Sequence, residues 1–76
     1  MKIGVEVNDF FKRFGVNVGK FEIECNINSK IEDIVKKLNI PPERIGFTVV
    51  NGKRANLDYV LSEGDNLVII PYALGG

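Results

Sequence analysis

Apolar and polar side chains alternate in two stretches of the N-terminal half, and this period of two residues predicts β-strands. The stretches are KIGVEVN, residues 2–8, and FEIECNIN, residues 21–28. One face of the second stretch is expected to carry Phe21, Ile23, Cys25 and Ile27. On that face Cys25 is expected to be a core thiol rather than a nucleophile. We expect the two strands to pair with each other.

The segment between these strands breaks the alternation. Phe10, Phe11 and Phe14 are separated by one, three and four positions, which fits a short helix. Gly15 and Gly19 then favour a loop. We expect the three phenylalanines to cover the core rather than to line a ligand pocket.

The main helix is predicted in SKIEDIVKKLN, residues 29–39. Its apolar positions repeat at helical spacing, so that one stripe of the helix faces the core; they are Ile31, Ile34, Val35 and Leu38. Ser29 followed by Glu32 is the pattern of a capping box at the N-terminus. The two prolines after Ile40 end the helix.

The C-terminal half predicts further strands. FTVVNG, residues 47–52, is a strand that ends in an Asn-Gly turn. Residues 53–65 are expected to form a short strand segment, a one-turn helix and a tight turn at Gly64-Asp65. NLVIIP, residues 66–71, is apolar almost throughout and reads as a central strand. The prediction is an α+β domain over residues 1–71, with one helix packed on one sheet face, and a flexible tail over residues 72–76.

Composition removes several classes of function. Ten acidic and ten basic residues give no net charge, which argues against a nucleic-acid partner. The chain has no histidine, and so it lacks the commonest general base and the commonest metal ligand. No apolar run approaches the roughly 20 residues of a membrane span, and no signal peptide is visible. We therefore expect a cytoplasmic protein that is not itself an enzyme and binds no cofactor or metal.

With these elements in place, the strand order resembles the β-grasp, or ubiquitin-like, fold. The C-terminal stretch VNGKRANLDYVLSEGDNLVIIPYALGG resembles the end of the sulfur-carrier proteins, which are the small subunit of molybdopterin synthase and the thiamine-biosynthesis sulfur carrier. The matching positions are Val50-Asn51, Gly52, Leu61, Gly64-Asp65, Leu67 to Ile70, Pro71 and Gly75-Gly76. The segment FFKRFG is similar to a short helix of the molybdopterin-synthase branch. Tyr72-Ala73-Leu74 departs from the proline-and-valine segment usual in that branch, which leaves the partner enzyme open.

The resemblance implies a chemical role for the last residues. A ubiquitin-activating-type enzyme would use ATP to adenylate the carboxylate of Gly76. Sulfur transfer would then give a thiocarboxylate that delivers sulfur to a synthase for molybdopterin, thiamine or tRNA biosynthesis. Glycine has no Cβ, so Gly75 and Gly76 permit close approach inside a narrow channel. Pro71 fixes a backbone dihedral where the tail begins.

Other roles remain open beside this one. The chain is alternatively a ubiquitin-like modifier, joined through Gly76 to lysines of other proteins. It is alternatively an interaction module without terminal chemistry, although an end at Gly76 counts against that. Terminal glycines on an arbitrary domain are most often only a frayed end.

A docking surface is predicted on the last strand. If Leu67 and Ile69 face the helix, Val68 and Ile70 face the other way. We expect Val50 and Thr48 to share that open face, with Phe47 and Val49 pointing inward. Grouped apolar residues on an exposed sheet face favour partner binding. The predicted partner-binding residues are Val50, Val68, Ile70, Pro71, Tyr72, Ala73 and Leu74.

Overall fold

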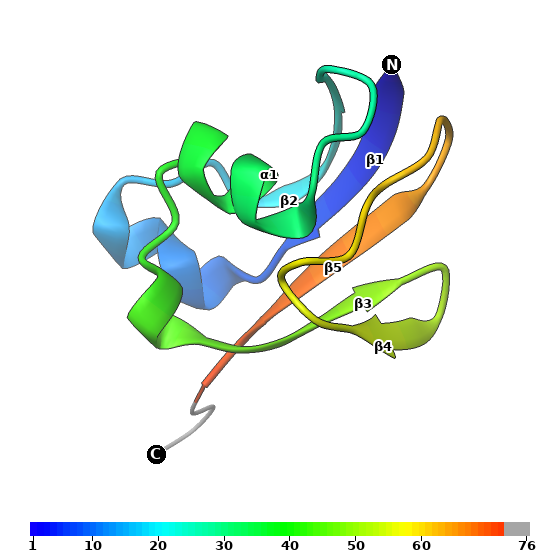
Figure 1. The fold of residues 1–76 in the computed structure, drawn as a ribbon. Helices are drawn as coiled ribbons and strands as arrows, with labels where there is room; N and C mark the ends of the chain where they lie inside the picture. Colours follow the sequence, from blue (N-terminus) through cyan, green and yellow to red (C-terminus); the bar gives the residue numbers. More distant parts are fainter. Residues whose placement is uncertain (73–76) are drawn as a thin grey trace.

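The computed structural model describes residues 1–72 of the 76-residue chain. A five-stranded sheet in the order β2-β1-β5-β3-β4 carries one α-helix across one of its faces (Figure 1). The strands are β1 (Lys2–Val7), β2 (Gly19–Glu24), β3 (Ile45–Val50), β4 (Lys53–Ala55) and β5 (Asn66–Pro71). The helices are α1 (Ile31–Lys37) and two 3₁₀ segments, η1 (Asp9–Phe14) and η2 (Pro42–Arg44). The predicted α+β sheet with its helix on one face is confirmed.

The last strand is the centre of the sheet. β5 pairs in parallel with β1 and antiparallel with β3, while β2 and β4 form antiparallel pairs on the outer sides. Because β1 and β5 run in parallel, the last residue of β5 lies at the end of the sheet farthest from Met1. This places the C-terminal exit of the chain next to β3 rather than beside the N-terminus.

The core lies between the sheet and α1. Every second residue of β1 and β5 points toward the helix and is at most 1% exposed; these residues are Ile3, Val5, Val7, Leu67 and Ile69. The predicted helical stripe packs on them, with Ile31, Ile34 and Val35 buried. Each such side chain contributes about 1.5–3 kcal/mol through its removal from water.

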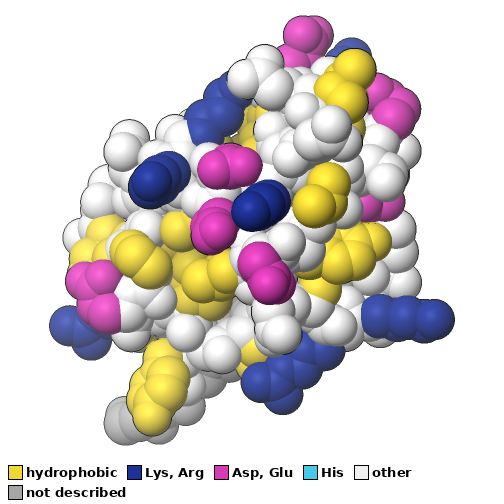
Figure 2. All heavy atoms as spheres, in the orientation of Figure 1, with side chains coloured by type: hydrophobic (Ala, Val, Ile, Leu, Met, Phe, Trp, Pro, Cys, Tyr) yellow, Lys and Arg dark blue, Asp and Glu magenta, His cyan; other side chains and the backbone are white. Residues whose placement is uncertain are grey.

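The other side of α1 is solvated. Glu32, Asp33, Lys36 and Lys37 are all exposed. Figure 2 shows acidic and basic side chains interspersed over the middle of this face, with apolar patches beside them. A mixed charged surface of this kind favours solubility over docking.

The predicted capping box is wrong by one residue. α1 begins after Lys30, whose backbone N–H donates to Asp33 Oδ2 at 2.8 Å. Ser29 belongs to the preceding turn, because its hydroxyl donates to the carbonyl of Asn26 and its own carbonyl accepts from Leu61 N–H. Long-range pairing with Leu61 therefore outweighs the local capping pattern.

The second strand is shorter at its end than predicted. It stops at Glu24, and Ile27 is 77% exposed instead of buried. The cause is a turn over residues 26–29, in which Asn28 adopts a φ of 70°. Cys25 remains half-buried against the core, as its place in the alternation predicts.

The predicted one-turn helix after β4 is not present. Residues 56–59 form a turn instead, and Val60 forms an isolated antiparallel bridge with Lys30. The carbonyls of Leu57 and Tyr59 accept the backbone N–H groups of Glu32 and Ile31 at 2.9 and 3.1 Å. Because the first N–H groups of a helix have no partner within it, this segment is used as a cap for α1.

Two turns are locked together at one end of the sheet. Asn51 and Gly52 have φ values of 51° and 83°, which confirms the predicted Asn-Gly turn. Asn51 Nδ2 donates to Asp65 Oδ1 at 2.9 Å, and Ser62 N–H donates to Asp65 Oδ2 at 2.8 Å. The buried carboxylate of Asp65 thus ties the Gly64-Asp65 turn to the β3–β4 hairpin.

Candidate functional site

The chain leaves the sheet at Pro71 and Tyr72. Pro71 is buried at the end of β5, whereas Tyr72 is 78% exposed. The backbone N–H of Tyr72 donates to the carbonyl of Arg44 at 2.7 Å. The last described residue is therefore held against the start of β3.

An apolar group lies beside this exit on the sheet face that α1 does not cover. Phe47 pairs with Ile70, and Val49 pairs with Val68, across the antiparallel β3–β5 ladder. Opposite residues in such a ladder share a face. Phe47 is 38% exposed and the other three are half-buried. We call these four residues the outer apolar cluster.

Charged residues frame the outer apolar cluster. The pairing places Arg54 beside Val49 on one side and Glu6 beside Val68 on the other. The Arg54 guanidinium lies 4.7 Å from the centroid of the Phe47 ring, within cation–π range. Arg54 therefore lies at the edge of the outer apolar cluster.

Val50 does not belong to this surface, and its predicted facing is wrong. Val50 is 5% exposed and Thr48 is 2% exposed, so both point toward the core. In the observed register they pair with Leu67 and Ile69, the inward residues of β5. A shift of one residue moves every side chain of a strand to the other face. The Thr48 hydroxyl tolerates burial because it donates to the carbonyl of Ala55 at 2.7 Å.

Phe47 and Val49 therefore take the places on the outer face that we expected for Thr48 and Val50. Sequence reasoning missed them because facing depends on the register between β3 and β5. No local pattern in FTVVNG reports that register, since apolar residues occupy both faces.

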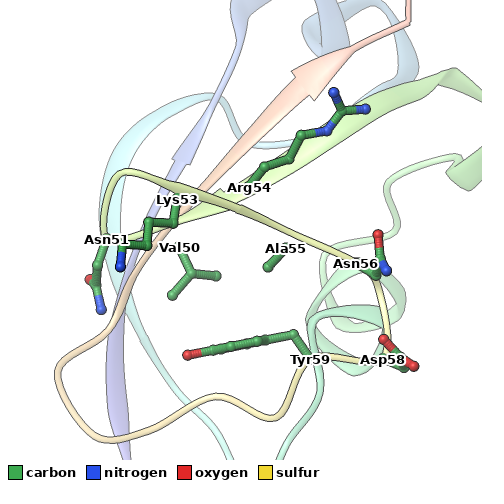
Figure 3. Close-up of a pocket in the computed structure, with 8 residues that line it drawn as sticks. All are labelled: Val50, Asn51, Lys53, Arg54, Ala55, Asn56, Asp58 and Tyr59. Atoms are coloured by element: carbon green, nitrogen blue, oxygen red, sulfur yellow. The ribbon is translucent and has the colours of Figure 1, made fainter.

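Val50 instead lines an open hollow of about 610 Å³ on the helix side of the β3–β4 hairpin. Figure 3 shows the Tyr59 ring extending below Val50 and Ala55, with Lys53 near one end and Asp58 near the other. In the same view Arg54 extends away from the hollow, in agreement with its contact on the outer face. The lining mixes both charges, and the Asn51 amide is already used by Asp65 and Asn66.

The phenylalanines after β1 divide between core and surface. Phe11 is fully buried, and Phe10 meets it edge to face at 5.6 Å. Phe14 is 39% exposed. The expectation that they cover the core is met by Phe11 and in part by Phe10.

Metal sites and membrane-spanning helices are both absent from the described part of the chain. No group of three or more His, Cys, Asp or Glu residues within residues 1–72 is placed to hold a metal ion. No helix in that range is long and apolar enough to cross a membrane.

The predicted site residues thus fall into four sets. Val68 and Ile70 lie on the outer face as predicted, and Pro71 and Tyr72 form the exit from the sheet. Val50 is in the core. The remaining candidates lie outside the described residues; they are Ala73, Leu74, Gly75 and Gly76.

Comparison with known proteins gives one family and several similar structures. A family model described as Mut7-C ubiquitin matches residues 1–74. No curated protein sequence matches the chain. Among solved structures, SAMP1 from Haloferax volcanii superposes with a TM-score of 0.71 at 16% identity, and the match covers 100% of both chains.

Two further structures carry molybdopterin-related names. The putative molybdopterin converting factor, subunit 1, from Pyrococcus furiosus has a TM-score of 0.71 at 21% identity, over 96% of this chain and 99% of that one. A chain of the complex of subunits 1 and 2 of molybdopterin-converting factor from Helicobacter pylori has a TM-score of 0.65 at 22% identity, over 100% of both. At these identities the likeness establishes the fold, and the predicted β-grasp, ubiquitin-like architecture is confirmed.

Proposed function

The chain belongs to the Mut7-C ubiquitin family, and on that premise we propose that it is a sulfur carrier whose working group is the carboxylate of Gly76. The observation that carries the proposal is the exit of the chain at Tyr72. It lies directly beside the outer apolar cluster and four residues before Gly76. A partner that binds the cluster is in position to receive the last residues.

The chemistry follows from the weakness of a carboxylate as an electrophile. In the partner enzyme a carboxylate oxygen of Gly76 attacks the α-phosphorus of ATP, and pyrophosphate leaves. Hydrosulfide then attacks the carbonyl carbon of the acyl-adenylate, AMP leaves as the carbon–oxygen bond breaks, and loss of the remaining S–H proton gives the thiocarboxylate. This chain supplies the acyl group, and ATP binds to the partner. Glycine at both final positions keeps side chains away from the reacting carbon.

The thiocarboxylate then donates its sulfur in a second enzyme. Molybdopterin synthesis is the acceptor pathway we propose first, because two structurally similar proteins are named as converting-factor subunits. One of them is named as a complex of subunits 1 and 2, which supports a protein partner for this chain as well. Thiamine and tRNA thiolation use the same terminal chemistry.

We assign the docking of the adenylating enzyme to the outer apolar cluster. Its four side chains are apolar, partly exposed and left uncovered by α1. Ile70 directly precedes Pro71, so the same strand provides the docking surface and the exit. Arg54 adds a cation at the rim, where charge affects association rate more than affinity.

Conjugation to lysines is the second candidate function. It is favoured by one specific likeness, to SAMP1 of H. volcanii, which a second structure names small archaeal modifier protein 1. Both functions share adenylation of Gly76 and differ in the acceptor, which is sulfur in one case and a lysine amine in the other.

ATP–pyrophosphate exchange by the adenylating enzyme of the same cell tests the shared step. The wild-type chain should support exchange, and a chain without Gly75 and Gly76 should not, while its melting temperature stays unchanged. Adenylation of the shortened chain would refute the role of Gly76.

The docking assignment is tested with a double variant, Val68→Asp and Ile70→Asp. Loss of about 2 kcal/mol of interface energy should raise KM by roughly 30-fold. The matched control is Ile27→Asp with Val60→Asp, since these side chains are 77% and 46% exposed and lie outside the cluster. A folded outer-face variant with a wild-type KM would place the docking surface elsewhere.

A further inference from the structure

β3 carries one residue more than β5 where the chain leaves the sheet. Ile45 pairs with Pro71, and Phe47 pairs with Ile70. Two steps along β3 therefore match one step along β5, and Gly46 is the extra residue of a β-bulge. A bulge bends its strand and increases the local twist, and such features often re-aim the chain near functional sites.

The backbone of the exit passes too close to Gly46 for any side chain. A Cβ atom at this position would lie 2.7 Å from the carbonyl oxygen of Pro71, 3.0 Å from Tyr72 Cα and 3.1 Å from the carbonyl carbon of Pro71. All three are backbone atoms, so no change of rotamer relieves the contact. Glycine is required here by close approach.

Of the two strands beside β5, only β3 pairs with Pro71. β1 pairs with β5 only as far as Ile69, so it does not hold Pro71 or Tyr72. Pro71 has no N–H to donate. The next donor, Tyr72 N–H, reaches the carbonyl of Arg44 at 2.7 Å, one residue before β3 begins.

We propose that Gly46 is a positioning residue, which fixes where Pro71 and Tyr72 lie as the chain leaves β5. The contact of Pro71 and Tyr72 with Gly46 and the bond to Arg44 together form what we call the exit clasp. The consequence for adenylation rests on the proposed function. The geometry of the exit clasp does not.

Gly46→Ala tests the position of the chain exit separately from the docking of the partner on the outer apolar cluster. The added methyl group should displace Pro71 and Tyr72. The Phe47–Ile70 pair lies on the side of the bulge away from the exit, so it should keep its register. A misplacement of about 1 Å at the reacting group reduces rates by up to about 100-fold. We expect kcat for adenylate formation to fall by about tenfold or more, with KM unchanged.

Gly4→Ala is the matched control. Gly4 is also half-buried in the interior of a strand, and it pairs with Asn66 at the other end of β5. A Cβ there would lie 2.8 Å from Asn66 Oδ1, which is the end of a side chain that can rotate away. The alanine at position 4 therefore makes a comparable close contact far from the exit of the chain. Both kcat and KM of Gly4→Ala should match the wild type.

Hydrogen exchange at the Tyr72 amide tests the exit clasp without any partner. The amide should be protected in the wild type and in Gly4→Ala. In Gly46→Ala it should exchange faster by about tenfold or more, on the scale of one lost backbone hydrogen bond. Retained protection in folded Gly46→Ala overturns the inference.

The kinetic test distinguishes this inference from the proposed function. If the wild type is not adenylated, the proposed function fails, and the exchange result still decides the role of Gly46. If the wild type is adenylated and Gly46→Ala has the same kcat, the proposed function stands and the inference is wrong.

A second pair of variants applies if Gly46→Ala does not fold. Tyr72→Pro removes the N–H that bonds to Arg44, whereas Tyr72→Ala removes the same ring and keeps the N–H. The proline variant should have the lower kcat by about tenfold. Equal kcat values for the two variants overturn the inference.

Discussion

Two adjacent isoleucines provide a matched test of which face of β5 is the core. Ile69 is 0% exposed and packs in the core, whereas Ile70 is half-buried on the outer face. The change to alanine removes the same three carbon atoms in both cases. Any difference in stability therefore comes from the environment of each side chain.

The expected losses in the free energy of unfolding follow from how deeply each side chain is buried. Three buried carbons account for about 2.4 kcal/mol at roughly 0.8 kcal/mol each. The cavity left among core side chains raises the cost of Ile69→Ala to about 3–4 kcal/mol. Ile70→Ala opens no closed cavity, since the site already faces solvent, and should cost about 1 kcal/mol. The free energy of unfolding of a 76-residue domain is roughly 4–11 kcal/mol in total, so Ile69→Ala removes a large part of it.

Thermal and urea unfolding followed by circular dichroism measure both losses. For a domain of this size each kcal/mol corresponds to a shift in Tm of about 4–8 °C. Ile69→Ala should lower Tm by at least about 12 °C and Ile70→Ala by about 4–8 °C. Equal losses, or a larger loss for Ile70→Ala, would show that the assignment of faces is wrong.

Two further changes test the interior. Asp65→Ala removes a buried carboxylate that accepts hydrogen bonds from Asn51 and Ser62, and it should lower the free energy of unfolding in urea by about 3 kcal/mol. The control is Asp58→Ala at an exposed position, whose free energy of unfolding should stay within about 0.5 kcal/mol of the wild type. Similar losses for both variants would contradict the stabilising connection between the two turns. Cys25→Ala should cost about 1 kcal/mol through a small cavity and leave sulfur transfer intact, as measured by thiocarboxylate formation; a folded variant that transfers no sulfur would show Cys25 to be catalytic.

The elements that the sequence predicted well are those with a clear period. Alternation located β1 and most of β2, and helical spacing located the buried stripe of α1. The Asn51-Gly52 signal located the β3–β4 turn, because few other residues accept positive φ at both positions. In these segments local preference and tertiary packing favour the same structure.

The errors arose where distant residues override the local pattern. Ser29 has the residue type of a helix cap, yet pairing with Leu61 draws it into a turn. Residues 57 and 59 read as a helical turn, yet their carbonyls cap α1. The facing of Val50 depends on its register against β5, and a sequence read one strand at a time contains no information on that register.

In the candidate site, too, some residues follow from local sequence patterns and others only from pairing with distant residues. Terminal glycines and the strand that leads to them are visible in the sequence, and so are Val68 and Ile70 on the outer face. Phe47 completes that face through pairing with Ile70, which only the structure reveals. Gly46 carried no signal at all, because its requirement for glycine comes from residues 71 and 72 on another strand.

The central claim is that the carboxylate of Gly76 is converted to a thiocarboxylate in the cell. The most direct measurement is the mass of the C-terminal peptide from the protein purified out of its native cell, with and without alkylation. We predict a fraction of the peptide that ends at Gly76, is heavier by the difference between one sulfur and one oxygen atom, and is alkylated at that sulfur. A peptide that continues beyond Gly76, or one that ends there only as a carboxylate or joined to lysines, would contradict the claim.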